Sequence, residues 1–333
     1  MTSNLMPSGT KTSLAEIQAP IRARLDRVSV EMARTVSSDL PLVGQVATHL
    51  LAMRGKLFRP TLLILSSSVS GGENEIAVPL AACLELIHLA TLVHDDAVDH
   101  SALRRGMPTV NSLFSHQISV IMGDFLYSTA LTRLVALGDI GALSALTRAS
   151  TEMTLGEMRQ LAVTEPLAFT EEEYYALIRS KTASLVRAAC EIGALVGAPE
   201  FLEPLGAYGE NLGMAFQITD DLIDYTEAKE TTGKPAGLDL HEHKVTLPLI
   251  FALRNASSKE RADIEKVFAA DDPQADDIAR VVEIVGAGGG FDYAREQGET
   301  YAARAREALA GLPAGVARTA LESSISYVME RHS

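Results

Sequence analysis

The amino-acid sequence predicts an all-α protein, and two observations support that prediction. Apolar residues recur at helical rather than alternating intervals in nearly every long segment. Glycine, proline and asparagine mark the intervals between these segments, as at Gly71-Gly72 and from Gly286 to Gly290. With 47% hydrophobic residues among 333, the chain can fill a large core.

The first helix is expected over residues 14–36, with Ser13 as its N-cap and Glu16 completing a capping box. Another is expected to begin at Pro60, because proline is tolerated in the first turn of a helix. The expected helices after the first cover residues 41–53, 60–70, 75–100, 115–137, 141–163, 171–197, 201–226, 243–254, 258–270, 274–284, 291–311 and 315–331. Those over 75–100 and 201–226 include stretches that are apolar on nearly all sides, which predicts that they are buried.

No linker, low-complexity tract or clear shift in composition interrupts the chain between Ala15 and Arg331. We therefore expect one large helical domain over residues 13–333. Residues 1–12 are polar and contain no apolar core, so we expect a disordered tail rather than a signal peptide.

Composition and charge narrow the class of protein. A formal net charge of −14 argues against a nucleic-acid partner, which normally requires a basic face. Cys83 and Cys190 both lie in apolar helical patterns and are expected to be buried free thiols in a reducing compartment. The longest apolar run, from Pro79 to Val93, is too short to span a bilayer. We expect a cytoplasmic protein with at most transient membrane contact.

Two near-copies of one acidic motif are the most informative local feature. DDAVD covers Asp95–Asp99 and DDLID covers Asp220–Asp224, so each places carboxylates one helical turn apart on one face. Both follow apolar helical segments, where unpaired charge is costly. Oxygen-bound Mg²⁺, which leaves room for substrate phosphates, is the natural partner of such clusters. The alternative is a pair of solvated helix ends, and the repetition of the motif argues against it.

Basic residues gather in short groups around the acidic motifs. A helix N-terminus and paired arginines both favour phosphate, and such groups suit two phosphate-bearing substrates. Each residue alone could equally be a solvated surface charge. The groups are RGKLFRP with Lys56 and Arg59, LRRGMPT with Arg104 and Arg105, SKTASL with Lys181 and Thr182, and TTGKPAG with Lys234.

Histidine is not expected to bind the metal. His88 lies two helical turns before Asp95, and a lone histidine on an apolar helix is more often a hydrogen-bonded core residue than a ligand. The histidines also lack partners at i+4, which a histidine metal site on a helix would use. His94 could support the neighbouring aspartates.

These motifs closely resemble the all-trans polyprenyl diphosphate synthases. The likeness runs through GKLFRP, ELIHLATLVHDDAVDHSALRRGMPTVN, VIMGDFLYSTA, GEMRQLA, IRSKTASL, AFQITDDLIDYTEAKETTGKPAGLDL, KVTLPLI and YVMER, over roughly residues 15 to 331. It implies an isoprenoid synthase fold, with long helices around a central cavity and residues 13–333 as the catalytic domain. It also implies a homodimer.

The resemblance assigns roles to individual residues. Asp95, Asp99 and Asp220 would bind Mg²⁺, three ions being expected with the allylic diphosphate. Asp96, Asp221 and Asp224 would support the two clusters, and these six aspartates with Lys181 would form the catalytic set. The allylic diphosphate would bind Arg104, Lys181, Thr182, Gln217 and Lys234, and isopentenyl diphosphate would bind Lys56, Arg59, His88 and Arg105. Lys244 is a weaker candidate in a closing loop.

The sequence departs from the family pattern in two places. The family commonly has GGKRxRP where this chain has Arg54 at the first glycine and Leu57 at the middle arginine. It commonly has GNDLREGK where this chain reads GLDLHEHK, with His241 and His243. These changes could alter loop closure or affinity, although neither removes an expected metal ligand.

The implied reaction joins isopentenyl diphosphate to an allylic diphosphate, expected to be farnesyl or geranylgeranyl diphosphate. Mg²⁺ and the basic residues would stabilise the leaving diphosphate, and the double bond of isopentenyl diphosphate would attack the allylic cation. Loss of a proton, with the released diphosphate as its acceptor, would give a chain longer by one unit. Quinone side chains are the expected use of the product.

Product length should depend on residues one and two turns before Asp95. Ala90 and Thr91 are small, and Ile87 follows one turn deeper, about 5.4 Å per turn. Small residues there are typical of medium- and long-chain synthases. The alternative is that Phe125 or Tyr127 closes the tunnel early, which would give geranylgeranyl diphosphate.

The sequence is also compatible with two other functions. A terpene cyclase or a head-to-head synthase also uses an aspartate-rich motif, but cyclases normally have a different second motif. A non-catalytic partner subunit of a heteromeric synthase would be expected to have lost one acidic cluster, and both are present here.

Overall fold

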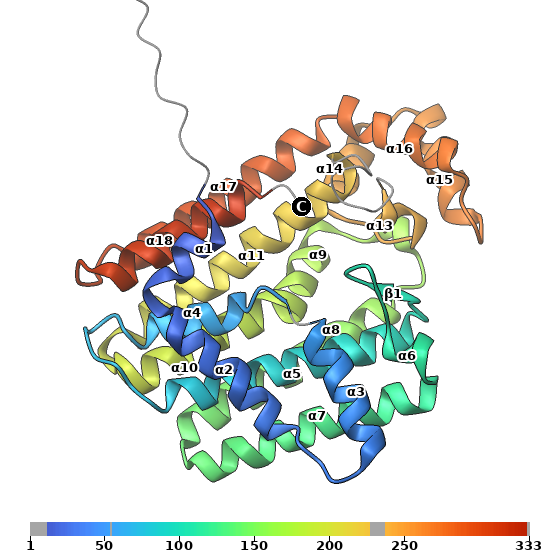
Figure 1. The fold of residues 1–333 in the computed structure, drawn as a ribbon. Helices are drawn as coiled ribbons and strands as arrows, with labels where there is room; N and C mark the ends of the chain where they lie inside the picture. Colours follow the sequence, from blue (N-terminus) through green and yellow to red (C-terminus); the bar gives the residue numbers. More distant parts are fainter. Residues whose placement is uncertain (1–11, 54, 227–236, 332–333) are drawn as a thin grey trace, which may run out of the picture.

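The computed structural model describes residues 12–53, 55–226 and 237–331, and it confirms the all-α prediction (Figure 1). The first half contains α1 (Leu14–Gln18), α2 (Arg22–Thr35), α3 (Pro41–Ala52), α4 (Phe58–Ser66), α5 (Ala77–Val98), α6 (Val110–Leu113), α7 (His116–Leu137) and α8 (Ile140–Leu161). The second half contains α9 (Glu171–Ile178), α10 (Ser184–Gly197), α11 (Leu202–Thr226), α13 (Leu238–His241), α14 (Leu247–Asn255), α15 (Ser258–Ala269), α16 (Ala275–Ala287), α17 (Gly290–Leu309) and α18 (Val316–Met329).

Helix α10 connects the two halves of the structure. It packs against α4, α5, α8 and α11, so it lies between the two helices that carry the acidic motifs. Helix α5 also packs against α2 and α7, and α11 packs against α17 and α18 (Figure 1). The apolar stretches of α5 and α11 are buried, as their sequences predict. Only their last turns carry clustered carboxylates.

Three predicted helices are interrupted or shifted. The helix expected over 14–36 contains a 3₁₀ turn, Ala19–Ile21, because Pro20 has no N–H to continue the helical ladder. The helix expected over 171–197 contains a π-helical segment, Arg179–Ala183, whose extra residue a simple helical pattern does not reveal. The helix expected from 243 begins at Leu247, while the short helices α6 and α13 were not expected.

A small hairpin was also not expected. Strand β1 (Leu103–Arg104) pairs with β2 (Met107–Pro108) through a two-residue turn at Arg105 and Gly106. Both turn residues have positive φ, +53° and +74°, as the tight turns that match the twist of a hairpin require. The hairpin holds Arg104 and Arg105 beside the end of α5.

The predictions for the first capping box and the cysteines are confirmed, whereas the N-terminal tail is not tested. The capping box at Ser13 and Glu16 is present, and Cys83 and Cys190 are buried free thiols. The tail expected over residues 1–12 falls almost wholly outside the described residues, so the proposed boundary stays a prediction.

Helices α5 and α7 are each long and apolar enough to cross a membrane by length and composition alone. In α5, 72% of the most apolar window is buried inside the structure, as befits a core helix. In α7 only 28% is buried, and Ile121 and Val135 are 66% and 61% exposed.

Candidate active site

Two cavities lie beside the acidic motifs and the basic groups. The first, about 500 Å³, is lined by Asp99, Gln160, Val163, Pro166, Phe169, Tyr174, Leu177, Ile178, Lys181, Thr182, Gln217, Asp221, Asp239, Glu242, His243, Lys244, Val245 and Thr246. The second, about 450 Å³, is lined by Gly55, Lys56, Leu57, Phe58, Arg59, Glu85, His88, Arg105, Val186, Phe216, Tyr327 and Arg331. The two linings separate predicted diphosphate-binding residues into two groups. Lys181, Thr182 and Gln217 line the first cavity, and Lys56, Arg59, His88 and Arg105 line the second.

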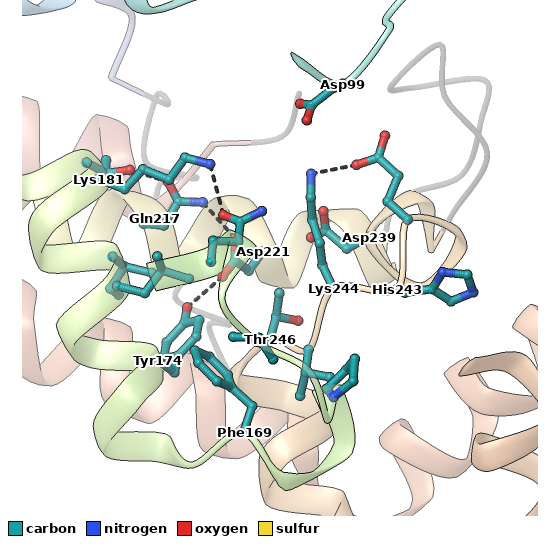
Figure 2. A pocket seen from close by; sticks show the side chains of 18 residues that line it. Asp99, Phe169, Tyr174, Lys181, Gln217, Asp221, Asp239, His243, Lys244 and Thr246 are labelled. Atoms are coloured by element: carbon teal, nitrogen blue, oxygen red, sulfur yellow. Dashed lines mark hydrogen bonds and ion pairs between the residues drawn. The ribbon is translucent and has the colours of Figure 1, made fainter. Parts of the chain in front are cut away.

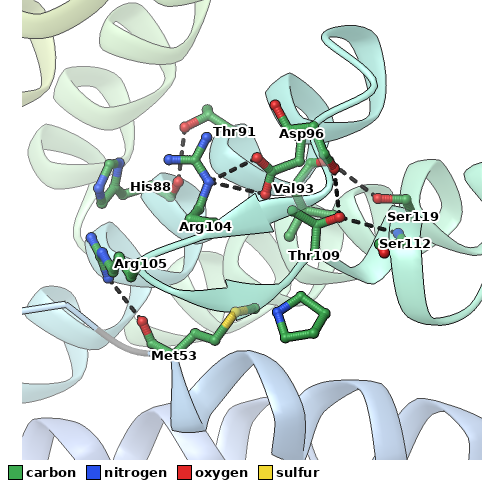
Figure 3. A network of polar contacts seen from close by, with 12 residues as sticks. Met53, His88, Thr91, Val93, Asp96, Arg104, Arg105, Thr109, Ser112 and Ser119 are labelled. Carbon is green, nitrogen blue, oxygen red and sulfur yellow. Dashed lines mark hydrogen bonds and ion pairs between the residues drawn. The ribbon is translucent and has the colours of Figure 1, made fainter. Parts of the chain in front are cut away.

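The first acidic motif ends α5. Asp96 is only 4% exposed, and both of its carboxylate oxygens accept from Nε of Arg104, at 2.8 and 2.9 Å (Figure 3). Arg104 therefore neutralises a buried carboxylate in this structure. Burial raises the pKa of Asp95 to about 6, and the negative charge of Glu157 adds to that effect. Asp99 follows α5 and lines the first cavity.

The second acidic motif lies near the end of α11, where Asp221 is buried and fully hydrogen-bonded. The hydroxyl of Tyr174 donates to Oδ2 at 2.6 Å, and Nε2 of Gln217 donates to Oδ1 at 2.7 Å (Figure 2). The hydroxyl of Thr182 donates in turn to Oε1 of Gln217 at 2.7 Å. These contacts orient Gln217 and Thr182 at the wall of the first cavity.

The two other aspartates of this motif have different surroundings. Asp220 is exposed and accepts from Nη2 of Arg331 at 2.9 Å. Asp224 accepts from the backbone N–H of Asp239 at 3.0 Å, which connects α11 with α13. Burial raises the pKa of Asp239 to about 7, and the charge of Asp224 adds to it.

The π-helical segment between α9 and α10 supplies Lys181 and Thr182. Nζ of Lys181 lies 2.6 Å from a carboxylate oxygen of Glu157 and 2.9 Å from Oε1 of Gln160, both on α8. π-helical insertions often occur at functional sites because they redirect side chains out of the regular helical pattern. Here the two adjacent side chains contact different helices: Lys181 contacts α8, and Thr182 contacts Gln217 of α11.

Lys244 lies in the first cavity close to carboxylates from both sides of it. It pairs with Glu242, and Asp239 and Asp99 are near enough to contribute to its charge balance (Figure 2). Burial lowers the pKa of Lys244, but the bond to Glu242 and these negative charges outweigh burial and raise it overall. Lys244 therefore stays charged in this cavity.

The second cavity gathers the residues expected at isopentenyl diphosphate. Nη1 of Arg59 lies 3.0 Å from Nε2 of His88, whose pKa is lowered well below its usual range by burial and then by Arg59. A neutral His88 can accept from Arg59. Nη1 of Arg105 donates to the carbonyl of Met53 at 2.9 Å (Figure 3). Its guanidinium would lie 2.7 Å from a Cβ at Gly55, so a larger residue there would shift Arg105.

Several residues of the site were missed by the sequence reasoning. Tyr174 gave no signal, since it is one of eight tyrosines without a motif of its own. Glu157 and Arg331 belong to GEMRQLA and to the segment that ends YVMER, which were noted only for their family likeness. Glu85, whose burial raises its pKa, lines the second cavity, and within the described chain its Oε2 has no hydrogen-bond partner.

Some predicted residues lie elsewhere. Lys234 is outside the described residues. His94 does not support the aspartates, because its Nε2 faces Val120 and Asp124 of α7. Ile87 and Ala90 are fully buried, and the hydroxyl of Thr91 bonds to the carbonyl of His88. These chain-length candidates are not in the lining of either cavity.

The predicted Mg²⁺ site can be tested on the chemistry of its donors. Within the described residues, no three His, Cys, Asp or Glu side chains stand close enough to hold a metal ion. The expected ligands lie on two helices, and Arg104 and Arg331 bind one aspartate of each motif. All the donors are carboxylates, and the burial that raises the pKa of Asp95 is a cost that a bound cation would offset. This donor set fits a hard divalent cation.

The all-α fold, the two aspartate motifs and the basic side chains that line both cavities fit an enzyme that binds diphosphates. The family described as Polyprenyl synthetase matches residues 40–285, and the chain belongs to this family. It is therefore a trans-polyprenyl diphosphate synthase, an enzyme that transfers prenyl groups.

Individual relatives agree over nearly the whole chain. An all-trans-nonaprenyl-diphosphate synthase (geranyl-diphosphate specific) of Rhodobacter capsulatus is 36% identical over 318 residues, 95% of this chain and 97% of that protein. Heptaprenyl diphosphate synthase component 2 of Geobacillus stearothermophilus is 36% identical over 311 residues, 92% and 95% of the two chains. The crystal structure of a Caulobacter crescentus polyprenyl synthase complexed with calcium and isoprenyl diphosphate has a TM-score of 0.92 at 34% identity, covering 98% and 100%.

Proposed function

We propose that this enzyme condenses isopentenyl diphosphate with an allylic diphosphate and repeats the step to make an all-trans medium- or long-chain polyprenyl diphosphate. The observation that carries the proposal is the pair of cavities, because one reaction with two diphosphate substrates needs two anion sites. The name of the Rhodobacter relative, a geranyl-diphosphate-specific nonaprenyl-diphosphate synthase, agrees with an allylic primer and a long product.

The first cavity would bind the allylic substrate. Lys181 and Thr182 would donate to its diphosphate, with Gln217 held in place by Asp221. Arg104 and Lys234 would complete the contacts. Groups that are fixed in advance stabilise the charge that builds on a leaving diphosphate without reorganising during the reaction. The closeness of Glu157 to Lys181 would keep the ammonium group directed along this wall.

Mg²⁺ fits the carboxylates of the two acidic motifs, of which Asp99 and Asp221 line this cavity. Asp95, Asp99 and Asp220 would hold it, with Asp96, Asp221 and Asp224 in support. When bound, it would neutralise the leaving diphosphate as a Lewis acid. Its ligands must be ionised, so the raised pKa of Asp95 would make its binding dependent on pH.

The second cavity would bind isopentenyl diphosphate through Lys56, Arg59, Arg105 and neutral His88. Holding this substrate apart from the first would align its double bond with the allylic carbon and reduce the entropic part of the barrier. The released diphosphate would accept the proton that is lost from the new chain. Exclusion of water from both cavities would protect the cation.

Product size would be limited by the α5 residues Ala90, Thr91 and Ile87. Incubation with Mg²⁺, labelled isopentenyl diphosphate and farnesyl diphosphate, followed by sizing of the dephosphorylated products, tests the whole proposal. A ladder that ends at six or more units supports it. A stop at geranylgeranyl would keep the reaction and reject the product length, and no incorporation would reject the reaction.

We propose a homodimer in the cytoplasm, with at most transient membrane contact. Helix α7 supports self-association, because Ile121 and Val135 are exposed on a largely unburied apolar helix. Burying such side chains against a second copy would remove apolar surface from water. Sedimentation equilibrium of the purified chain would distinguish a dimer from a monomer.

A second candidate is supported by the name of the Geobacillus relative, a component 2 of heptaprenyl diphosphate synthase. This chain could likewise be one component of a two-chain enzyme. Activity of the purified chain without a partner would reject this candidate, whereas activity that appears only on adding a second protein would support it.

A further inference from the structure

Arg331 joins the second acidic motif to the lining of the second cavity. Its side chain is 18% exposed and its Nη2 lies 2.9 Å from Oδ1 of Asp220, in the second acidic motif. The same guanidinium lies 4.2 Å from the ring centroid of Phe216, and both residues line the second cavity. One arginine therefore touches an expected metal ligand and borders the pocket for the other substrate.

The other terminal nitrogen of this guanidinium makes no hydrogen bond to the described residues. Nη1 of Arg331 is buried and has no hydrogen-bond partner within the described part of the chain. A buried donor without an acceptor costs free energy that a ligand oxygen would recover. Lys56, Arg59 and Arg105 border the same cavity, so an anionic group is the acceptor that this environment favours.

The geometry suits arginine in particular. Stacking on Phe216 holds the plane of the guanidinium, and its Nη groups can then donate in two directions. Lysine would present one compact ammonium nitrogen on a flexible stem, without a planar group that Phe216 could hold or a second nitrogen to reach toward the cavity. Nearby, Lys56 instead bonds to the hydroxyl of Tyr327 at 3.4 Å and has no contact of this kind with Asp220.

We propose that Arg331 is a positioning residue that couples the two substrate sites. Without ligands it is the counter-ion of Asp220 and competes with a divalent cation for that carboxylate. When the diphosphate of isopentenyl diphosphate occupies the second cavity, Nη1 donates to it, and its greater negative charge draws the guanidinium away from Asp220, which becomes available. This inference rests on the proposed function of both cavities. By linkage, each ligand then strengthens the binding of the other.

The test uses the full chain and Mn²⁺ as the probe, with its binding measured by water-proton relaxation. Free Mn²⁺ is corrected for complexes with isopentenyl diphosphate. In the wild type, isopentenyl diphosphate should tighten Mn²⁺ binding about fivefold or more, the usual scale of coupling between sites. Arg331→Met should bind Mn²⁺ more tightly than the wild type when no diphosphate is present, and the diphosphate should add nothing further.

Two further variants sharpen the result. Arg304→Met removes another arginine that lies over an aromatic ring, Tyr301 at 5.1 Å, outside the linings of both cavities, and should behave as the wild type. Arg331→Lys keeps a positive charge near Asp220 but lacks the second nitrogen that would reach a diphosphate in the cavity. It should therefore keep the weak Mn²⁺ binding of the free wild type and lose the coupling.

Unchanged Mn²⁺ affinity together with unchanged coupling in Arg331→Met would overturn the proposal. Weaker Mn²⁺ binding in that variant would also overturn it, because Arg331 would then organise Asp220 rather than compete for it. If the wild type bound neither Mn²⁺ nor isopentenyl diphosphate, the proposed function itself would fail, a result distinct from the failure of Arg331 alone.

Discussion

The hydroxyl of Tyr174 donates to Oδ2 of Asp221 at 2.6 Å, inside the wall of the first cavity. Tyr174 comes from α9 and Asp221 from α11, so this bond fixes the second acidic motif against a neighbouring helix. Burial and then the charge of Asp239 raise the pKa of Asp221, while the bonds from Tyr174 and Gln217 counteract them.

Replacing Tyr174 with phenylalanine should therefore lower both stability and activity. Loss of this bond leaves a buried carboxylate oxygen without its donor, at a cost of about 1–3 kcal/mol. We expect kcat to fall about tenfold, because a free-energy cost of this size corresponds to about one factor of ten in rate. Steady-state kinetics and urea unfolding would measure the two effects. Tyr175→Phe is the matched control, because its hydroxyl bonds to Gln297 instead, and a similar loss of kcat there would contradict the assignment.

Stability without metal should depend on pH through Asp239. Its pKa is raised in the folded protein from 3.8 to about 7, so the folded state binds the proton more tightly than the unfolded state does. Between these values the free energy of unfolding should therefore rise as pH falls. Thermal unfolding in EDTA from pH 8 to pH 5 would show this rise. Asp239→Asn should flatten the curve, and an unchanged slope would contradict the cause.

Metal dependence should follow the aspartates of the first motif. Asp99→Asn removes one negative charge from a cavity that would hold a divalent cation. We expect activity to fall about a hundredfold or more, the usual effect of removing one group that stabilises the charge of the transition state. Removal of metal with EDTA should abolish turnover, and Mg²⁺ should restore it. Asp292→Asn is a control on an exposed carboxylate, 88% accessible on α17. Full activity in EDTA would reject a metal-dependent reaction.

Product length should respond to Ala90, which is 1% exposed on α5. A phenylalanine there would project toward the space expected to hold the growing chain and should shorten the product. Overpacking a buried site costs about 1–3 kcal/mol, so the variant must first be shown to fold. Chromatography of the dephosphorylated products would size the chains, and an unchanged length would reject this account of the tunnel.

The positions of the acidic motifs could be predicted because they depend on local sequence. Apolar periodicity places Asp95 and Asp220 near the ends of buried helices, and the structure has them there. The pairing of Asp220 with Arg331 could not be predicted, since it joins residues 111 positions apart. The π-helical insertion at Lys181 was also hidden, because one extra residue hardly disturbs a helical pattern.

The last departure from the family pattern also leads to a test. His243 stands where the family commonly has glycine, and its φ is +55°, a conformation that costs a side-chain-bearing residue about 1–2 kcal/mol relative to glycine. Its Nε2 lies 2.9 Å from the carbonyl of Ala270, which offsets part of this strain. His243→Ala keeps the strain and loses the bond, whereas His243→Gly loses both.

We therefore expect the glycine variant to be more stable than the alanine variant by about 1 kcal/mol, the cost of the left-handed backbone. Urea unfolding of the two variants would measure the difference. Because both lack the imidazole, the comparison isolates the backbone from the bond to Ala270. Equal stabilities, or a more stable alanine variant, would show that the backbone at this position is not strained and that the histidine is tolerated for another reason.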